Sequence, residues 1–254
     1  MNADAVKPLA GKVALVTGAV RRIGRAIALS LAADGAAVIV HGRTSEAEAR
    51  AVAAEIEQLG AASMVYLADV VDEAAVRGMA AQIDERFGRL DVLVNNAAIR
   101  AQVPFLELSL AQWREITSVI LDGAFVVTKA CLPLMLRSGD GGQIVNIGGA
   151  TAYTGAFERA HVVTAKAGIG GFTRALATEF ADRGITVNCV VPGRIGGQRS
   201  KTAGAEPPPG HHEPIVGRPG MPEEVAAMVR PLWLPTGRYV TGQTIHVNGG
   251  TAFH

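Results

Sequence analysis

The residues best suited to chemistry near the start of the chain lie in a glycine-bearing turn. The sequence Thr17-Gly-Ala-Val-Arg-Arg-Ile-Gly24 follows a short β-branched run and leads directly into a helical pattern. Such a turn directs backbone N–H groups and the positive end of a helix at a phosphate group. On the first strand of a βαβ unit, the pattern predicts a dinucleotide pyrophosphate site. The expected cofactor contacts here are Gly18, Val20, Arg21, Arg22, Ile23 and Gly24.

The second predicted strand indicates which dinucleotide binds. The chain continues as Val38-Ile-Val-His-Gly-Arg-Thr44, and Gly42 stands where NAD-binding folds of this kind place an acidic residue for the adenine ribose. Arg43 and Thr44 follow, and Arg21 projects from the turn toward the same ribose. Arginine binds phosphate with a planar fork, so these side chains favour a 2′-phosphate. We therefore expect NADP(H), with two solvated surface arginines as the alternative.

These residues need a particular order of elements to position them. Short β-branched runs alternate with alanine-rich helical patterns, which is typical of βαβ units and a parallel sheet. We expect one α/β domain over residues 1–254, a doubly wound Rossmann domain whose seven-stranded parallel sheet carries helices on both faces. The predicted strands are 12–17, 37–41, 64–67, 92–94, 143–147, 186–190 and 244–247. The predicted helices are 22–33, 46–59, 73–87, 110–137, 157–182 and 223–232.

Composition excludes several classes of function. The chain has 254 residues, of which 49% are hydrophobic and 19% charged, as in a compact globular protein. A net charge of +1 and an aromatic content of 5% argue against a nucleic-acid surface. No apolar run approaches a membrane span, and Cys131 and Cys189 form no metal or redox motif. We expect a cytoplasmic protein with a small-molecule substrate and neither a nucleic-acid nor a membrane partner.

Residues 194–220 interrupt the alternation of strands and helices. They include two adjacent glycines, three consecutive prolines and the pair His211-His212. A long insertion of this kind in an open α/β sheet is usually a lid or a binding loop. We expect a flap on the substrate side. The two histidines have no third ligand nearby in the sequence, so no metal site is predicted.

Four other stretches resemble the short-chain dehydrogenase/reductase family, and the resemblance extends from Leu9 to the end of the chain. They are Asn95-Asn-Ala-Ala98, Ile144 to Lys166, Val191-Pro-Gly-Arg-Ile195 and Tyr239 to Gly250. The arginine at position 22, where the family usually has glycine, is similar to the pteridine-reductase branch. The resemblance implies further cofactor contacts at Asp69, Val70, Asn96, Ala97, Lys166, Pro192, Gly193 and Ile195.

The same resemblance exposes a gap in the proton-transfer residues. The family has a serine, a Tyr-x-x-x-Lys motif thirteen residues later, and an asparagine on the long middle helix. Here Gly149, Val162 and Ile120 occupy the serine, tyrosine and asparagine positions, whereas Lys166 is present. The spacing from Gly149 to Lys166 is the family's seventeen residues, so a shifted alignment does not recover the tyrosine. Losing a positioned acid typically costs about 10²–10⁴ in rate.

Two side chains are candidates for a relocated proton donor beside Lys166. Tyr153 lies in the loop before the helix, and His161 lies five residues before the lysine. Either can exchange a proton with a substrate near neutral pH once its environment shifts its pKa. The alternatives are that Tyr153 only lines the pocket and that His161 is a solvated or hydrogen-bonded helix residue. We include Lys166, Tyr153 and His161 as the candidate catalytic set.

Three functions fit this pattern. The first is an NADP(H)-dependent oxidoreductase that transfers hydride to or from a small carbonyl, imine or enone and uses a nonstandard proton donor. The second is a non-redox enzyme on the same scaffold. The third is a catalytically inactive NADP-binding subunit with a regulatory or scaffold role. The resemblance also implies a homo-oligomer, either a dimer or a tetramer, formed through the two long helices.

Overall fold

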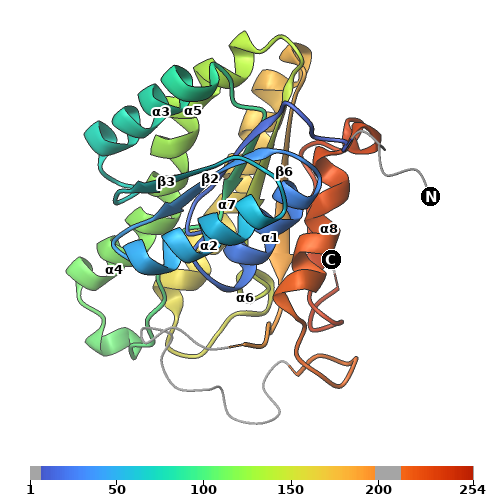
Figure 1. Ribbon diagram of the computed structural model, residues 1–254. Helices are drawn as coiled ribbons and strands as arrows, with labels where there is room; N and C mark the ends of the chain where they lie inside the picture. The colour runs from blue at the N-terminus through green and yellow to red at the C-terminus, as the bar shows by residue number, and fades with distance from the viewer. Residues whose placement is uncertain (1–6, 198–212, 254) are drawn as a thin grey trace.

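The computed structural model describes residues 7–197 and 213–253, which form one α/β unit around a parallel sheet. The sheet has seven parallel strands in the order β3-β2-β1-β4-β5-β6-β7, so the order in which strands are added reverses between β1 and β4 (Figure 1). This arrangement confirms the predicted fold. The strands are β1 (Val13–Val16), β2 (Ala37–Gly42), β3 (Ser63–Leu67), β4 (Val92–Asn95), β5 (Gly142–Ile147), β6 (Ile185–Pro192) and β7 (Thr244–Val247).

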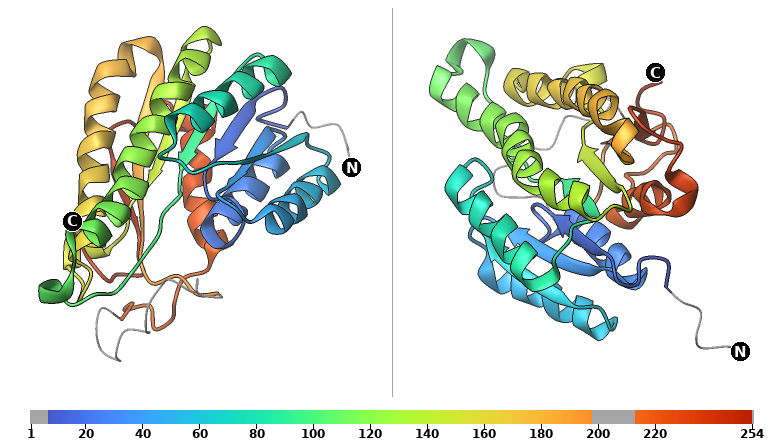
Figure 2. Two further views of the ribbon diagram at one scale, coloured as in Figure 1. Left: turned by 90° about the vertical axis from the view of Figure 1, so that its left-hand side faces the viewer. Right: turned by 90° about the horizontal axis from the view of Figure 1, so that it is seen from above.

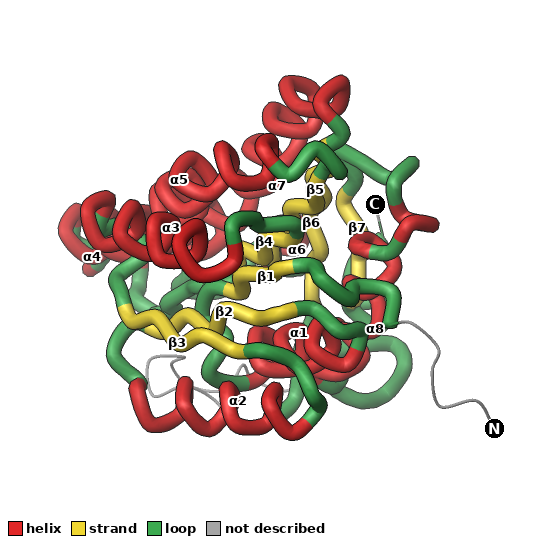
Figure 3. Tube along the Cα trace, turned by 45° about the horizontal axis from the view of Figure 1, so that its top comes forward, coloured by secondary structure: helices red, strands yellow, loops and turns green. Residues whose placement is uncertain are grey.

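Helices cover both faces of this sheet, as Figure 2 and Figure 3 show. One layer contains α1 (Arg22–Ala33), α2 (Glu46–Gln58) and α8 (Pro222–Trp233). The other contains α3 (Glu73–Phe87), α5 (Gly123–Arg137) and α7 (Ala160–Phe180). Two shorter helices, α4 (Leu110–Thr117) and α6 (Thr151–Thr154), lie toward the carboxyl ends of the strands (Figure 1). Single 3-10 turns occur at Phe105–Glu107, Ala181–Arg183 and Pro235–Gly237.

Alternation within the buried strands builds two cores. In β1, Ala14 and Val16 pack with the α1 layer, whereas Val13 and Leu15 pack with the α3 layer. All four are buried because helices cover both faces. This explains why the strands read as continuous apolar runs rather than as alternating ones.

The predicted helix over residues 110–137 is interrupted. A π-helical turn, Ser118–Asp122, separates α4 from α5, and the Gly123 N–H donates to the Ser118 carbonyl. The π turn itself contains no proline or glycine, and Gly123 follows it directly. A π turn lengthens the hydrogen-bond step from four residues to five. Although the sequence has no uninterrupted apolar run of membrane-spanning length, the helical stretch Leu110–Arg137 is on average long and apolar enough to cross a membrane. Over half of its most apolar window is buried in the fold, as in the core helix of a soluble protein.

The second long helix begins later than predicted. We expected it from residue 157, but α7 starts at Ala160 with Arg159 as its N-cap. Glu158 has a φ of +56°, a backbone conformation incompatible with a continuing right-handed helix. Arg159 therefore lies outside the helix, not on the same face as Lys166.

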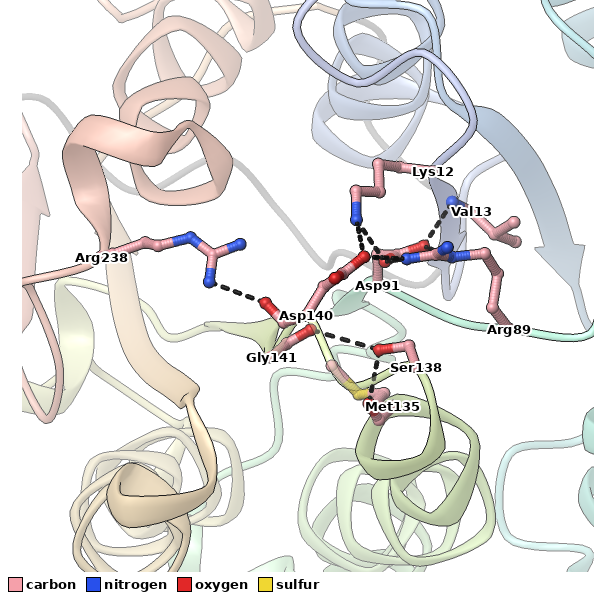
Figure 4. Close-up of polar contacts among 9 residues, drawn as sticks. All are labelled: Lys12, Val13, Arg89, Asp91, Met135, Ser138, Asp140, Gly141 and Arg238. Atoms are coloured by element: carbon pink, nitrogen blue, oxygen red, sulfur yellow. Dashed lines mark hydrogen bonds and ion pairs between the residues drawn. The ribbon is translucent and has the colours of Figure 1, made fainter.

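A network of charges closes the amino ends of the central strands (Figure 4). The buried Asp91 carboxylate receives the Val13 N–H at 2.9 Å and two N–H groups from Arg89 at 2.8 and 2.6 Å. Asp140 receives both Lys12, at 2.6 Å, and Arg89, at 2.8 Å. The network joins β1 to the loops before β4 and β5. It lies at the opposite edge of the sheet from the residues predicted to bind cofactor.

Candidate active site

The phosphate-binding turn after β1 is built around backbone positions that only glycine can occupy. Gly18 has a φ of +62°. A Cβ on Gly24 would collide with the Gly18 carbonyl oxygen, because the start of α1 packs tightly under the turn. The Asn96 side chain fixes the turn from below by donating to the carbonyls of Thr17 at 2.9 Å and Gly18 at 3.0 Å. The cradle therefore fits a pyrophosphate approached by bare backbone.

Thr17 connects this turn to the segment that follows β4. Its hydroxyl accepts the N–H groups of Asn96 at 2.9 Å and Ala97 at 3.0 Å. Because β1 and β4 are neighbours at the point where strand order reverses, their carboxyl ends create the crevice in which such folds bind ligands. Asn96 and Ala97 therefore lie where the sequence placed them.

Arg22 has an unusual conformation inside the turn. Its φ is +49°, in the left-handed region that favours glycine, which is the residue usual in the family at this position. The side chain does not point outward. Its guanidinium donates to the Ile195 carbonyl at 2.7 Å, and so ties the phosphate turn to the loop after β6.

The carboxyl end of β2 favours a phosphate over a free ribose. A Cβ on Gly42 would lie 3.0 Å from Val20 Cγ1, so an acidic side chain could enter only if Val20 moved. Arg43 is exposed and lies 3.8 Å from Asp69. Arg21 and Thr44 are also exposed. This edge presents positive charge and a hydroxyl, as a 2′-phosphate requires.

His41 is a site residue that the sequence reasoning missed. It is buried on β2, where its Nδ1 accepts the Gly18 N–H at 3.3 Å and its Nε2 lies 3.1 Å from the Ala68 carbonyl. Burial lowers the pKa of His41 to about 4, so the ring is neutral at physiological pH. The imidazole thus joins the phosphate turn to the strand end that precedes Asp69 and Val70. The one feature of the sequence that could have indicated this role is a histidine within an otherwise apolar, buried strand.

The loop after β6 forms the other wall of the crevice. The Gly193 N–H donates to the Val247 carbonyl at 3.0 Å, and a Cβ at Gly193 would lie 2.6 Å from Asn248 Cα. Ile195 pairs with Gly220 in an isolated parallel bridge. Much of the predicted flap, including His211-His212, lies outside the described residues. Pro192, at the end of β6, accepts the Ala150 N–H at 2.9 Å.

Lys166 is buried at the centre of the crevice. Its ammonium donates to the Ile147 carbonyl at 2.5 Å, and the residue is 7% exposed. Burial, followed by the charge of Arg100, lowers the pKa of Lys166 to about 7, while Cys189 opposes the shift. An ammonium with this pKa exchanges protons readily at neutral pH.

The three substituted positions differ in how much space they leave. Val162 and Ile120 are 5% and 3% exposed and pack together in one apolar cluster. Gly149 is open instead, because a Cβ there would meet Lys166 Cγ only at 3.7 Å, an ordinary contact distance. A cavity of about 10 Å³, which is about the size of one water molecule, is lined by Lys166, Ile120 and Asn95.

The two candidate relocated acids lie at different depths. The Tyr153 ring packs edge-on against His246 with centroids 4.7 Å apart. Its hydroxyl is 3.9 Å from the Cβ position of Gly170, one helical turn beyond Lys166. His161 is fully buried, and burial lowers its pKa while a hydrogen bond with the Arg159 backbone opposes the shift. Proton donation by either residue stays a prediction.

Comparison with known proteins places this geometry in a family. Residues 18–252 match a family model described as enoyl-(acyl carrier protein) reductase. A 3-oxoacyl-[acyl-carrier-protein] reductase from Synechocystis is 41% identical over 243 residues, which cover 95% of this chain and 97% of the relative. The chain is a short-chain dehydrogenase/reductase.

Two solved structures superpose closely on this chain. A dehydrogenase/reductase from Sinorhizobium meliloti has a TM-score of 0.89 at 34% identity and covers 98% of both chains. An acetoin dehydrogenase from Salmonella typhimurium has a TM-score of 0.85 at 32% identity, covering 94% of this chain and 95% of that one. This short-chain dehydrogenase/reductase is an NADP-dependent oxidoreductase.

Proposed function

We propose that this protein reduces 3-oxoacyl thioesters to 3-hydroxyacyl thioesters with NADPH. The observation that carries the proposal is the identity with a 3-oxoacyl-[acyl-carrier-protein] reductase over nearly the full length of both chains. The complete phosphate turn and the two arginines at the ribose edge support it. We propose that the protein acts on a small-molecule substrate and that it is located in the cytoplasm.

The chain's own residues divide the reaction between them. The turn at Gly18 and the Arg21–Arg43 edge bind the phosphates, and Lys166 holds the ribose beside the nicotinamide. When bound, NADPH supplies a hydride to the carbonyl carbon. The protein must then give the carbonyl oxygen a proton, and it must do so with neither a tyrosine at position 162 nor a serine at position 149. We propose a nonstandard proton donor.

The test is NADPH oxidation by the purified full chain with acetoacetyl-pantetheine and with acetoacetyl-acyl carrier protein. We expect turnover with both thioesters and formation of the 3-hydroxy product by mass spectrometry. Acetoin and diacetyl serve as competing small ketones, because one structural neighbour is an acetoin dehydrogenase. Turnover of these ketones with none of the thioesters would reject the proposed substrate class.

Cofactor choice has its own matched pair of variants. Arg43→Ala should reduce the preference for NADPH over NADH roughly tenfold, because a charged hydrogen bond to phosphate is worth about 1.5–3 kcal/mol. Arg77→Ala removes an equally exposed arginine on α3 and should leave the preference unchanged. An unchanged preference in Arg43→Ala would contradict the 2′-phosphate assignment.

A catalytically inactive NADP-binding subunit is the second candidate. The apolar packing of Val162 and Ile120 favours it, since neither position can transfer a proton. It requires NADPH binding in the micromolar range or tighter without turnover of any carbonyl, imine or enone. Product formation from the thioester at any rate dependent on Lys166 would exclude it.

We also propose a homo-oligomer formed through α7. Its exposed face carries Ala167, Gly171 and Ala175, small residues that permit close approach of another helix. A Cβ at Gly171 would meet nothing within 4 Å in the protomer. Gly171→Glu should therefore leave the fold intact and shift the light-scattering mass toward a monomer. Ala47→Glu on the exposed face of α2 is the control, and an unchanged mass in both would oppose this interface.

A further inference from the structure

The turn between β5 and α6 is rigidly placed beside Lys166. Ala150 is buried, and its N–H donates to the Pro192 carbonyl at 2.9 Å. The Ala152 N–H donates to the Gly149 carbonyl at 3.0 Å, which closes a tight turn over Thr151. The Gly155 N–H then bonds the Thr151 carbonyl at 3.0 Å. Thr151 is therefore held by backbone bonds on both sides.

This turn directs the Thr151 hydroxyl toward the space that a side chain at position 149 would occupy. A Cβ on Gly149 would have three neighbours within 4 Å: Lys166 Cγ at 3.7 Å, Thr151 Oγ1 at 3.9 Å and Lys166 Cδ at 4.0 Å. A serine hydroxyl lies one bond beyond Cβ. The hydroxyl present at position 151 and the one absent at position 149 thus belong to the same small volume, beside the stem of Lys166.

Thr151 is also accessible to a ligand. The residue is half-buried, whereas Val162 and Ile120 are closed within an apolar cluster. A threonine hydroxyl can donate one hydrogen bond and accept another, so it can sit between an ammonium and a substrate oxygen. The Tyr153 hydroxyl lies 3.9 Å from the Cβ position of Gly170, and His161 is fully buried, whereas the Thr151 hydroxyl lies beside position 149.

We infer that Thr151 takes over the role of the missing serine and, together with Lys166, forms the proton-donating pair of this enzyme. The inference rests on the proposed ketone reduction and names the groups that touch its substrate oxygen. As hydride from the nicotinamide dinucleotide forms the new C–H bond, the C=O π electrons move to oxygen. The Thr151 hydroxyl proton passes to that oxygen, and an Nζ proton of Lys166 passes to Thr151. Lys166 is left neutral and regains a proton from solvent.

Three variants of the full-length protein test this pair. Thr151→Val removes the hydroxyl at nearly constant shape and should lower kcat by about 10²-fold, as expected for losing one donor to the developing charge. Thr151→Ser keeps a hydroxyl and should remain close to wild type. Gly149→Ser in the Thr151→Val background restores a hydroxyl to the same volume and should recover about tenfold of the loss.

Ligand binding supplies a readout independent of turnover. NADPH affinity, followed by its fluorescence, should be the same in wild type and Thr151→Val, because Thr151 does not hold cofactor. Binding of acetoacetyl-pantetheine to the NADP⁺ complex, measured by calorimetry, should weaken about tenfold in Thr151→Val and recover in Thr151→Ser.

The outcomes separate this inference from the proposed function. If wild type turns over the thioester and Thr151→Val matches it, the inference fails and the proposed function stands. Equal impairment of Thr151→Ser and Thr151→Val also overturns the inference, because only packing would then matter. If the wild-type protein shows no turnover, the proposed function fails. In that case the inference about Thr151 is also overturned if Thr151→Val binds the thioester as tightly as wild type, or if wild type does not bind the thioester. Loss of activity in Tyr153→Phe or His161→Ala with Thr151→Val unaffected would assign the donor there.

Discussion

Charged side chains are paired with one another at the amino ends of the strands, whereas at the carboxyl ends the central lysine is buried and donates to a backbone carbonyl. At the amino ends of the strands, Asp91 and Asp140 share Lys12 and Arg89 in a network of short hydrogen bonds (Figure 4). At the carboxyl ends, the Lys166 ammonium has one carbonyl acceptor at 2.5 Å. Both non-glycine residues with positive φ among the described residues, Arg22 and Glu158, also lie at this edge.

Paired charge and buried charge have different consequences for titration. Lys12, followed by Arg89, lowers the pKa of Asp140 to about 2 and so fixes its charge over the whole working range. Burial lowers the pKa of Lys166 to about 7 and leaves it able to gain or lose a proton. The first arrangement holds a fold together, and the second suits proton transfer.

The largest expected effect comes from removing one lysine at each edge. Lys166→Met should reduce turnover by about 10³-fold, because it removes both a cofactor contact and the proton source. Its unfolding free energy should not fall, since a buried cation is replaced by an apolar side chain. Lys12→Met should show the reverse: near-normal turnover and a stability loss of about 1 kcal/mol. Urea titrations measure the stability of both variants, and steady-state kinetics measure their turnover. Similar stability and turnover in the two variants would contradict the difference between the two edges.

Breaking the amino-edge network at its buried member should cost the most stability. Asp91→Ala leaves the Val13 N–H and the Arg89 guanidinium without their carboxylate, for an expected loss of about 3 kcal/mol. Asp84→Ala breaks an exposed pair with Arg137 and should cost less than about 1 kcal/mol. Equal midpoints in chemical denaturation would show that burial does not govern these pairs.

The pH profile tests the carboxyl edge directly. Reduction requires protonated Lys166, so kcat/KM should be level below pH 7 and fall up to about tenfold per pH unit above it. Burial favours the neutral lysine in the folded state. Stability should therefore rise from pH 7 toward 10.5, where the unfolded chain still binds this proton. A reduction rate that stays level to pH 9 would contradict Lys166 as the donor.

The smallest expected effect concerns Arg22. Arg22→Gly relieves the positive φ but removes the bond to the Ile195 carbonyl, so thermal stability should change little. NADPH should dissociate about tenfold faster, because the phosphate turn and the loop after β6 are no longer tied. Stopped-flow release of NADPH measures this. Arg22→Ala keeps the strain without the bond and should also lower the melting temperature.

Much of the fold could be predicted because local signals agreed with packing. Helices α1 and α3 and strand β7 have the predicted bounds, and Gly88 ends α3 in the left-handed conformation. The break at Ser118–Asp122 was not predicted, because the π turn contains no proline or glycine and Gly123 follows it only as the first residue of α5. The late start of α7 depends on the φ of Glu158, which the residue type does not specify.

The site was predictable where backbone sets the chemistry and less so where side chains approach across space. Gly18 and Asn96 lie together, because the Asn96 side chain donates to the Gly18 carbonyl at 3.0 Å, whereas the cofactor roles of these residues and of Lys166 stay predictions. His41 and Thr151 were missed, because their importance comes from neighbours far along the chain or across a turn. The family pattern indicated that a serine hydroxyl is missing at Gly149, but it could not indicate that the Thr151 hydroxyl lies beside this position.

Gly149 and Val162 differ in how much space surrounds them. The two departures from the family pattern therefore differ in how many substitutions would reverse them. A serine could return at Gly149 by one substitution, because the volume is still open. A tyrosine at Val162 would need room that Ile116, Ile120 and Ile169 now fill, so several coordinated changes would have to accompany it. A serine at position 149 could therefore be lost or regained by one substitution, whereas a tyrosine at position 162 could not.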